Sequence, residues 1–201
     1  KQLETVKNLI LLGAPIPVAF FAYPNKPSVL IPEGCNVVDV APEGYDLLDA
    51  LTAIAEELGA TDIEPVRQKA EKPALMSGEL TPESIAAAIG HLMPKDAIIA
   101  DESVTSGRGL MPFTAGTEQH DWLSLTGGSI GIGMPFATGA AIACPDRKVI
   151  CLEGDGSGMY TLQALWTQAR EKQNVINIVF ANHSYLVLNV ELARVGAGDP
   201  G

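Results

Sequence analysis

The sequence predicts an α/β fold in which a parallel sheet lies between two layers of helices. Apolar runs that end near Ala100, Glu153 and Ala181 are each followed by a polar segment rich in turn-forming residues. Stretches with the apolar spacing of helices separate these runs. Strands that alternate with helices favour crossover connections, and such connections make the strands parallel. Because the carboxyl ends of parallel strands meet at one edge of a sheet, we expect the three polar turns to line a common crevice.

The first part of the chain reads as a small α/β unit. Residues 8–13 and 36–40 are expected to be strands, and residues 45–59 an amphipathic helix that ends at Gly59. The apolar face of that helix would consist of Leu47, Leu51, Ile54 and Leu58. We assign residues 1–62 to this unit and residues 63–78, which are polar and contain two prolines, to a linker.

Residues 79–201 form the second predicted unit. Thr81-Pro82-Glu83 predicts a helix start with a cap and a first-turn proline, and Ile85, Ile89 and Leu92 would be its buried face. A strand over residues 97–100, a glycine-rich turn and an Ala-rich stretch to Cys144 should follow. The unit then continues with a strand over residues 148–153, a helix over residues 159–172 and a strand over residues 175–181. Met159, Leu162, Leu165, Trp166 and Ala169 would form one apolar face of that last helix.

The turn Gly154-Asp155-Gly156-Ser157 and the later Asn182 carry the strongest chemical signal. Each follows a predicted strand, so the Asp155 carboxylate and the Asn182 amide oxygen should reach the same crevice. Hard oxygen ligands of this kind suit Mg2+ that carries a diphosphate. The two glycines allow a tight turn and a close approach to a ligand, and Ser157 adds a hydroxyl donor. The alternative is an ordinary loop in which Asp155 only caps a helix.

These residues resemble a known motif. The segment from Gly154-Asp155-Gly156-Ser157 to Ala181-Asn182 looks like the thiamine diphosphate motif, which begins with Gly-Asp-Gly and ends with a pair of Asn residues. Residues 125–135 and 164–168 are similar to the corresponding parts of acetolactate synthase and benzoylformate decarboxylase-type enzymes. Ala181 replaces the first Asn of the pair, but the metal ligand in the family is the second.

The resemblance implies a role for each matching position. The Mg2+ ligands would be Asp155, Asn182 and the carbonyl oxygen of Ser184. The Gly128 carbonyl would accept from the aminopyrimidine ring, and Ile130 would be the apolar wedge that bends the cofactor. The remaining residues expected to contact thiamine diphosphate are Val104, Thr105, Gly154, Gly156, Ser157 and Tyr185. A glycine-rich helix start with a purely structural role is the alternative for Gly128 and its neighbours.

The same resemblance implies a function and a domain plan. It implies a thiamine diphosphate- and Mg2+-dependent lyase or transferase that acts on 2-keto acids, either acetolactate synthase-like or a simple decarboxylase. Residues 1–62 would be the C-terminal part of the family's central, Rossmann-like domain. Some members bind FAD there, but Gly13 and Asp39 are too little to predict it. The glutamate that acts on the cofactor lies on an N-terminal domain that no segment here resembles. We therefore expect no catalytic residue in this piece and no turnover by it alone.

The composition limits the classes of molecule that the protein is expected to bind. The formal net charge of −11 argues against nucleic acid and against anionic membrane surfaces. No apolar run is long enough to span a bilayer, and no signal peptide is recognisable. Cys35, Cys144 and Cys151 are odd in number and lie in apolar surroundings, so we expect free thiols and a cytoplasmic protein. By analogy with the family, the full-length chain would be a homodimer or homotetramer.

Two other classes of function are weighed against this one. A dinucleotide-binding domain is disfavoured because Phe136 occupies the last glycine position of the pattern that starts at Gly131. A non-catalytic module that keeps the fold is disfavoured by the intact Asp155 and Asn182. Among the histidines, His91 should face solvent or a helix end. His120 should lie in a loop, with some chance of reaching substrate, and His183 should flank the metal ligand.

Overall fold

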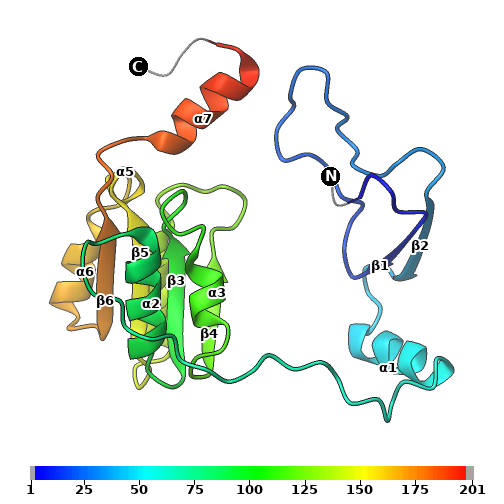
Figure 1. Cartoon of the computed structure of the whole chain (residues 1–201), viewed down its shortest axis with the longest axis horizontal. Coiled ribbons are helices and arrows are strands. Elements are labelled where there is room, and N and C mark those ends of the chain that lie inside the picture. Colours follow the sequence, from blue (N-terminus) through cyan, green and yellow to red (C-terminus); the bar gives the residue numbers. More distant parts are fainter. Residues whose placement is uncertain (1–2, 198–201) are drawn as a thin grey trace. The chain divides into compact units, whose positions relative to one another are not determined.

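The chain folds into two units, which are described separately. The computed structural model describes residues 3–197 (Figure 1). The first unit comprises the chain up to Val66 together with Arg194–Ala197, and the second comprises Arg67–Ala193 within the described range. The division between Val66 and Arg67 falls within the segment that the sequence analysis assigned to a linker.

The second unit contains a four-stranded sheet. Its strands are β3 (Ala97–Glu102), β4 (His120–Ser124), β5 (Val149–Gly154) and β6 (Val175–Phe180), in the order β4-β3-β5-β6. All three strand pairs are parallel, which confirms the predicted fold class. The strand β4 is an addition: the prediction that His120 lies in a loop is wrong, because His120 pairs with Ala97 at the start of β4.

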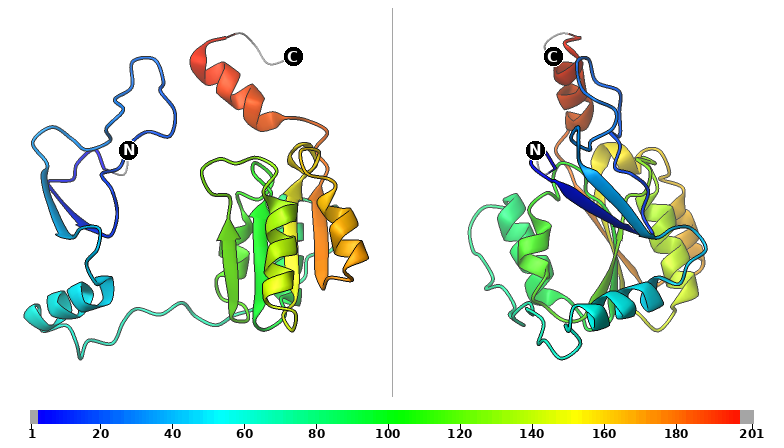
Figure 2. Two further views of the ribbon diagram at one scale, coloured as in Figure 1. Left: turned by 180° about the vertical axis from the view of Figure 1, so that it is seen from behind. Right: turned by 90° about the vertical axis from the view of Figure 1, so that its right-hand side faces the viewer.

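Helices cover both faces of this sheet (Figure 2). On one face, α2 (Pro82–Leu92) and α3 (Leu110–Thr114) pack together over residues such as Ile99 and Leu152. On the other face, α4 (Gly133–Ala143) and α6 (Ala164–Arg170) pack over residues such as Ala100 and Cys151. Side chains of a strand alternate between its faces, so the two central strands are apolar on both. This alternation also decides where the last side chains of β3 and β5 point.

The start of α2 agrees with the sequence, but its end does not. Thr81 accepts from the Ser84 N–H at 3.1 Å, and Ser84 accepts from the Thr81 N–H at 2.8 Å, which forms a capping box. Ile89 is buried, as predicted. Leu92 is 69% exposed, whereas Met93 is buried. Because Met93 lies four residues after Ile89, it continues the buried face of α2 just past the end of the helix, in the place that was predicted for Leu92.

The single helix predicted over residues 159–172 is wrong. Only α6 (Ala164–Arg170) is helical within that range, and the short helix α5 (Asp155–Gly158) precedes it. Of the predicted apolar face, Met159, Leu162 and Trp166 are exposed, while Ala164 and Gln168 are buried. Gln168 donates from Nε2 to the Met134 carbonyl at 3.3 Å and to Thr138 Oγ1 at 3.0 Å on α4. The buried face of α6 therefore combines this polar contact with the apolar packing of Ala164 and Leu165.

The first unit is sparse. It holds two parallel strands, β1 (Asn8–Leu12) and β2 (Asn36–Ala41), and the helix α1 (Leu47–Glu57). The last helix of the chain is α7 (Leu186–Val195), most of which is assigned to the second unit. Gly59 adopts a φ of +61° just after α1, as expected for a helix end. No residue of α1 is buried, so its predicted apolar face is not covered, because two strands offer too little apolar surface to bury a helix.

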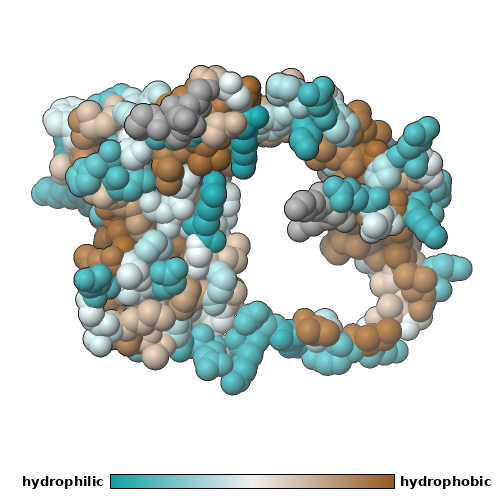
Figure 3. Space-filling model, turned by 45° about the horizontal axis from the view of Figure 1, so that its top comes forward, coloured by the Kyte–Doolittle hydropathy of each residue, from teal (hydrophilic) through white to brown (hydrophobic). Residues whose placement is uncertain are grey.

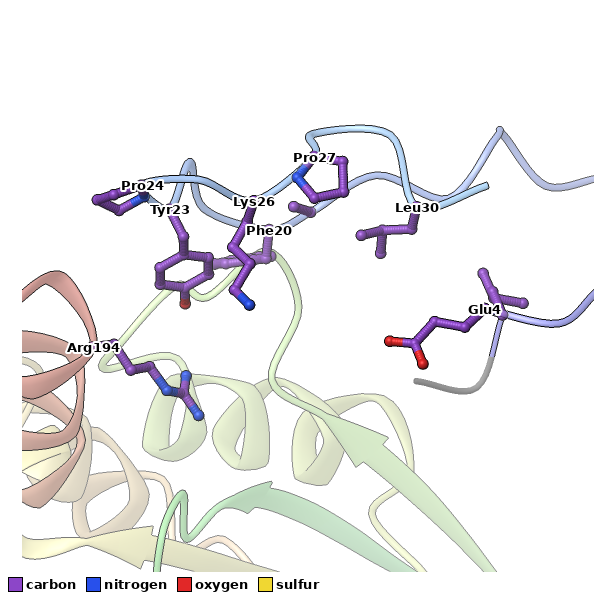
Figure 4. A pocket seen from close by; sticks show the side chains of 10 residues that line it. Glu4, Phe20, Tyr23, Pro24, Lys26, Pro27, Leu30 and Arg194 are labelled. Atoms are coloured by element: carbon purple, nitrogen blue, oxygen red, sulfur yellow. The ribbon is translucent and has the colours of Figure 1, made fainter. Parts of the chain in front are cut away.

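Apolar side chains remain exposed at the surface (Figure 3), including Ile10, Val18, Phe20 and Val38 of the first unit. The long connection between β1 and β2 supplies Phe20, Tyr23 and Lys26 to the lining of a cavity (Figure 4). None of the predicted site residues lines that cavity. Within the described part of the chain, no helix is long and apolar enough to cross a membrane.

Candidate functional site

A small cavity lies at the carboxyl edge of the sheet, where the three predicted turns meet. Residues from the ends of β3, β5 and β6 line it together. The lining consists of Ser103, Val104, Thr105, Ser106, Gly154, Asp155, Gly156, Ser157, Asn182, Ser184, Tyr185, Leu186 and Val187. The chain runs from β3 outward to β4 and then crosses back to β5, so the order reverses between β3 and β5. Such a reversal opens a crevice at the carboxyl ends of the strands, where α/β sheets bind ligands.

Asp155 and Asn182 are held by backbone groups of this cavity. Asp155 accepts from the Gly156 N–H at 2.9 Å through Oδ1 and from the His183 N–H at 2.8 Å through Oδ2. Asn182 accepts from the Ser184 N–H at 2.9 Å. Each of these oxygens has a further lone pair for a ligand. The bond from His183 ties the turn after β6 to the turn after β5, so the two side chains are oriented together.

The donor set suits a hard cation. It offers one carboxylate and one amide oxygen at a cavity that Ser184 also lines, and oxygen ligands of this kind are those that Mg2+ takes. Among residues 3–197 there is no group of three or more His, Cys, Asp and Glu side chains able to hold a metal ion. A site with a single carboxylate leaves room for the phosphate oxygens that Mg2+ prefers to share. These residues therefore fit a Mg2+–diphosphate.

Two residues near this cavity have a strained backbone. Val104 has a φ of +49° and His183 a φ of +54°, in the left-handed region that a β-branched residue such as Val104 rarely adopts. Such strain is held by the surrounding structure and concentrates at functional sites. The turn at Val104 is anchored from the preceding residues. Ser103 donates from Oγ and N to Asp101 Oδ1 at 2.5 and 3.0 Å, and Trp122 donates to Asp101 Oδ2 at 3.2 Å.

Glycine at position 156 permits a close contact. A Cβ at this position would lie 2.7 Å from Cε1 of Tyr185, so the Tyr185 ring packs directly on the Gly156 backbone. This contact closes one side of the turn that carries Asp155. It shows why the turn needs glycine here, independent of any ligand.

Gly128 and Ile130 do not line the cavity. They lie in the turn that leads into α4, where Gly128 accepts from the Ile130 N–H at 2.9 Å and adopts a φ of +66°. Ile130 is 40% exposed. The sequence predicts this turn but not the side chain that holds it. The last side chain of β3, Glu102, accepts from the Gly131 N–H and from the Gly133 N–H, both at 2.5 Å.

Glu102 has a buried carboxyl neighbour. Glu102 and Glu153 lie opposite each other in β3 and β5, and both are almost completely buried. Burial raises the pKa of Glu153 to about 8, and the negative charge of Glu102 adds to this, while a hydrogen bond from the Met134 backbone opposes it. At neutral pH Glu153 is therefore protonated. Its Oε1 has no hydrogen-bond partner within the described residues.

Neither glutamate was predicted as part of a site. Glu102 appeared only as a polar residue after a strand that was expected to end at Ala100, and Glu153 as the last residue of an apolar run. A carboxyl residue at the end of each of two buried strands was the available signal. The register that places them opposite each other was not visible in the sequence.

The histidines bring no acid–base group to this cavity. His91 Nδ1 lies 2.9 Å from the Pro73 carbonyl, and His120 Nδ1 lies 2.7 Å from the Glu118 carbonyl. His183 contacts Asp155 at the cavity through its backbone N–H. Of the two alternatives predicted for His91, the helix end is the one observed, since His91 lies in the last turn of α2, and its ring also contacts the segment before α2.

The comparisons with known proteins define the class. Residues 106–198 match the family described as thiamine pyrophosphate enzyme, C-terminal TPP binding domain. The chain belongs to the thiamine pyrophosphate-dependent enzymes and carries their C-terminal TPP-binding domain.

Within that family, the relatives point to one branch. The chain is 52% identical over all 201 residues to the acetolactate synthase-like protein IlvX of Mycobacterium tuberculosis and covers 39% of that protein. It is 30% identical to the benzoylformate decarboxylase of Pseudomonas aeruginosa, with 88% of this chain and 36% of that protein covered. The chain therefore spans about two fifths of the length of these relatives.

A solved structure agrees with this assignment. The thiamine diphosphate-dependent 4-hydroxybenzoylformate decarboxylase of Rhodococcus jostii RHA1 superposes with a TM-score of 0.72 at 25% identity. The superposition covers 99% of this chain and 40% of that one. The chain is thus of acetolactate synthase or benzoylformate decarboxylase type.

Proposed function

We propose that this chain binds thiamine diphosphate through Mg2+. We further propose that the full-length protein decarboxylates a 2-keto acid and joins the product to a second carbonyl compound, as acetolactate synthase does. The observation that carries the proposal is the cavity at the carboxyl edge of the sheet. It brings Asp155, Asn182 and Ser184 together with the turn at Val104 and Thr105. The similarity to IlvX over the whole chain favours this branch.

In this proposal the residues of the chain bind and orient the cofactor. Asp155, Asn182 and the Ser184 carbonyl would hold Mg2+, because all three offer hard oxygens at one cavity. Ser157 and Thr105 would donate hydroxyls to diphosphate oxygens. The Gly128 carbonyl and Ile130 would position the ring end of the cofactor. Thiamine diphosphate itself supplies the carbon nucleophile and the electron sink for decarboxylation, and the protein supplies orientation and electrostatics.

A simple 2-keto acid decarboxylase is the second candidate. Its support is the similarity to two proteins whose names state decarboxylation of benzoylformate-type substrates. The two candidates share the cofactor and its binding residues, so the site described above does not separate them. Product analysis of the full-length protein with pyruvate and with benzoylformate does: carboligation yields a longer 2-hydroxy-3-keto acid or a hydroxyketone, whereas simple decarboxylation yields an aldehyde. The predicted cytoplasmic location and homodimeric or homotetrameric assembly stay predictions.

The test is a titration of the protein with thiamine diphosphate, once with Mg2+ and once with EDTA, followed by the fluorescence of Trp122 and Trp166. We expect saturable quenching that EDTA abolishes. Asp155→Ala should remove the metal-dependent binding, because it deletes the only carboxylate among the proposed ligands, while circular dichroism stays unchanged.

A matched control is available in the same unit. Asp146→Ala removes an exposed carboxylate from the turn before β5, at the opposite end of the strand from Asp155, and should bind as the wild type does. Binding that survives Asp155→Ala would overturn the metal assignment. Absence of binding by the wild type in both conditions would favour a module that keeps the fold without the cofactor.

A further inference from the structure

The turn from Gly127 to Gly133 is fastened to the sheet by one buried side chain. Glu102 is only 1% exposed, and its two carboxylate oxygens accept from two amides of this turn. Oε1 accepts from Gly131, and Oε2 accepts from Gly133, each at 2.5 Å. Both bonds are short and charge-assisted, the strongest class of hydrogen bond between protein groups. They connect parts of the chain that are 29 and 31 residues apart.

The fit around Glu102 is tight enough to fix the position of the turn. A Cβ on Gly133 would lie 2.9 Å from Cβ of Glu102 and 2.3 Å from Oε2 of Glu153. The backbone at Gly133 therefore packs closely on both side chains, but it is Glu102 that accepts the hydrogen bonds from Gly131 and Gly133. Gly131, with a φ of +94°, is also held from the other side, because its carbonyl accepts from Thr161 Oγ1 at 2.6 Å.

We propose that Glu102 is a positioning residue for thiamine diphosphate: it holds the turn that carries Gly128 and Ile130 in register with the diphosphate cavity. This inference rests on the proposed function. Glu102 ends β3, and the residues directly after it, Ser103–Ser106, line the diphosphate cavity. Glu102 thereby sets the spacing between the two ends of the cofactor site. Its backbone leads into the diphosphate cavity, and its side chain holds the turn that carries Gly128 and Ile130.

The competing explanation is that Glu102 only satisfies the start of α4. The residue before α4, Ile132, makes no side-chain capping bond, and helix starts leave backbone N–H groups that need acceptors. That explanation accounts for the bond to Gly133. The bond to Gly131 lies outside the helix, on the side of Ile130 and Gly128, and capping does not require it. The two explanations differ in what they predict for binding of the ring end of the cofactor.

The experiment compares wild type, Glu102→Gln and Glu102→Asp, with Glu153→Gln as the matched control. Gln is isosteric, but its NH2 group opposes one of the two amides, so only one bond survives. Asp keeps the charge on a shorter side chain and should restore binding in part. Glu153 is equally buried and lies opposite Glu102, yet its backbone partner is Met134 rather than the turn. Thermal unfolding and circular dichroism establish that each variant folds.

Two readouts are measured. The first is hydrogen exchange at Gly131 and Gly133 in the protein without cofactor, which reports the bonds to Glu102 directly. The second is the affinity for thiamine diphosphate and, separately, for inorganic pyrophosphate, both with Mg2+. Pyrophosphate occupies only the Asp155 and Asn182 end of the site. We expect Glu102→Gln to speed hydrogen exchange at Gly131 and Gly133 and to lower the affinity for thiamine diphosphate by about tenfold. The affinity for pyrophosphate should stay unchanged.

The outcomes separate this inference from the proposed function. If Glu102→Gln weakens both ligands equally, or neither, the positioning role is overturned. The same holds if Glu153→Gln reproduces its effect. If the wild type binds neither ligand, the proposed function fails and the role toward the cofactor fails with it. In that case, protection of Gly131 and Gly133 that Glu102→Gln abolishes would leave Glu102 with the structural role alone.

Discussion

Replacing Glu153 with Gln should make the protein more stable at alkaline pH and remove part of its pH dependence. Glu153 is fully buried beside Glu102. Burial first, and then the charge of Glu102, raise its pKa from 4.5 to about 8. The folded state therefore binds this proton more tightly than the unfolded state does. Gln keeps the shape of the protonated side chain and has no proton to lose.

The direction of the effect follows from proton linkage. Below about pH 4.5 the carboxyl is protonated in both states, and the stabilisation from the folded-state proton is fully present. As the pH rises towards 8, the unfolded chain ionises while the folded protein keeps its proton, so the free energy of unfolding falls. The decrease reaches about 1.4 kcal/mol per pH unit. Over the whole window it amounts to something on the order of 5 kcal/mol.

The assay is urea unfolding of both proteins between about pH 5.5 and pH 8.5, with EDTA present so that no metal contributes. Every other titrating group is common to the two proteins, so the difference between their unfolding free energies isolates Glu153. That difference should grow with pH in favour of Glu153→Gln, with an unchanged dependence on urea concentration. Parallel curves would refute the buried, protonated state of Glu153.

Three further predictions concern packing, capping and thiol chemistry. Gly90→Ala in α2 should lower the melting temperature and cost about 1–3 kcal/mol, because its Cβ would lie 2.0 Å from the Phe113 carbonyl oxygen; Gly139→Ala in α4, where nothing lies within 4 Å, should instead be neutral or stabilising. Thr81→Ala should cost about 1 kcal/mol in urea unfolding, and Thr81→Ser, which keeps the capping hydroxyl, should restore it; equal losses would contradict the capping role. Cys151 is buried, and burial, followed by the neighbouring Glu153 carboxyl, raises the pKa of its thiol, so a thiol reagent should modify Cys35 and Cys144 in the native protein and Cys151 only after unfolding.

Local sequence was a sufficient guide to the main strands and to the cavity at their ends. The apolar runs of β3 and β5 are continuous because both faces of a central parallel strand are buried, whereas β6 lies at the edge of the sheet and is only partly buried. The polar residues that follow these strands could be placed at one edge of the sheet from the sequence alone, because the carboxyl ends of parallel strands lie at the same edge. The cap of α2 was equally local, because its partners are three residues apart.

Weak or mixed patterns led to errors. The strand β4 reads His-Asp-Trp-Leu-Ser, and only its pairing with β3 makes it a strand. The stretch after Asp155 has helical spacing of apolar residues, but the chain turns between α5 and α6 and buries Ala164 and Gln168 instead. Gln168 is buried there because it hydrogen-bonds to α4 beside the apolar packing of Ala164 and Leu165, and a buried polar residue is missed by a search for apolar periodicity.

The sequence by itself determined the α/β class, the parallel strands and the meeting of Asp155 with Asn182, because each depends on interactions between near neighbours or on a general rule of parallel sheets. Only the tertiary structure decided that Glu102 and Glu153 face each other and that Glu102 holds Gly131 and Gly133. Those contacts depend on the register of β3 against β5 and on where α4 begins. Register is a property of the assembled sheet, since shifting a strand by one residue would turn these side chains to the other face.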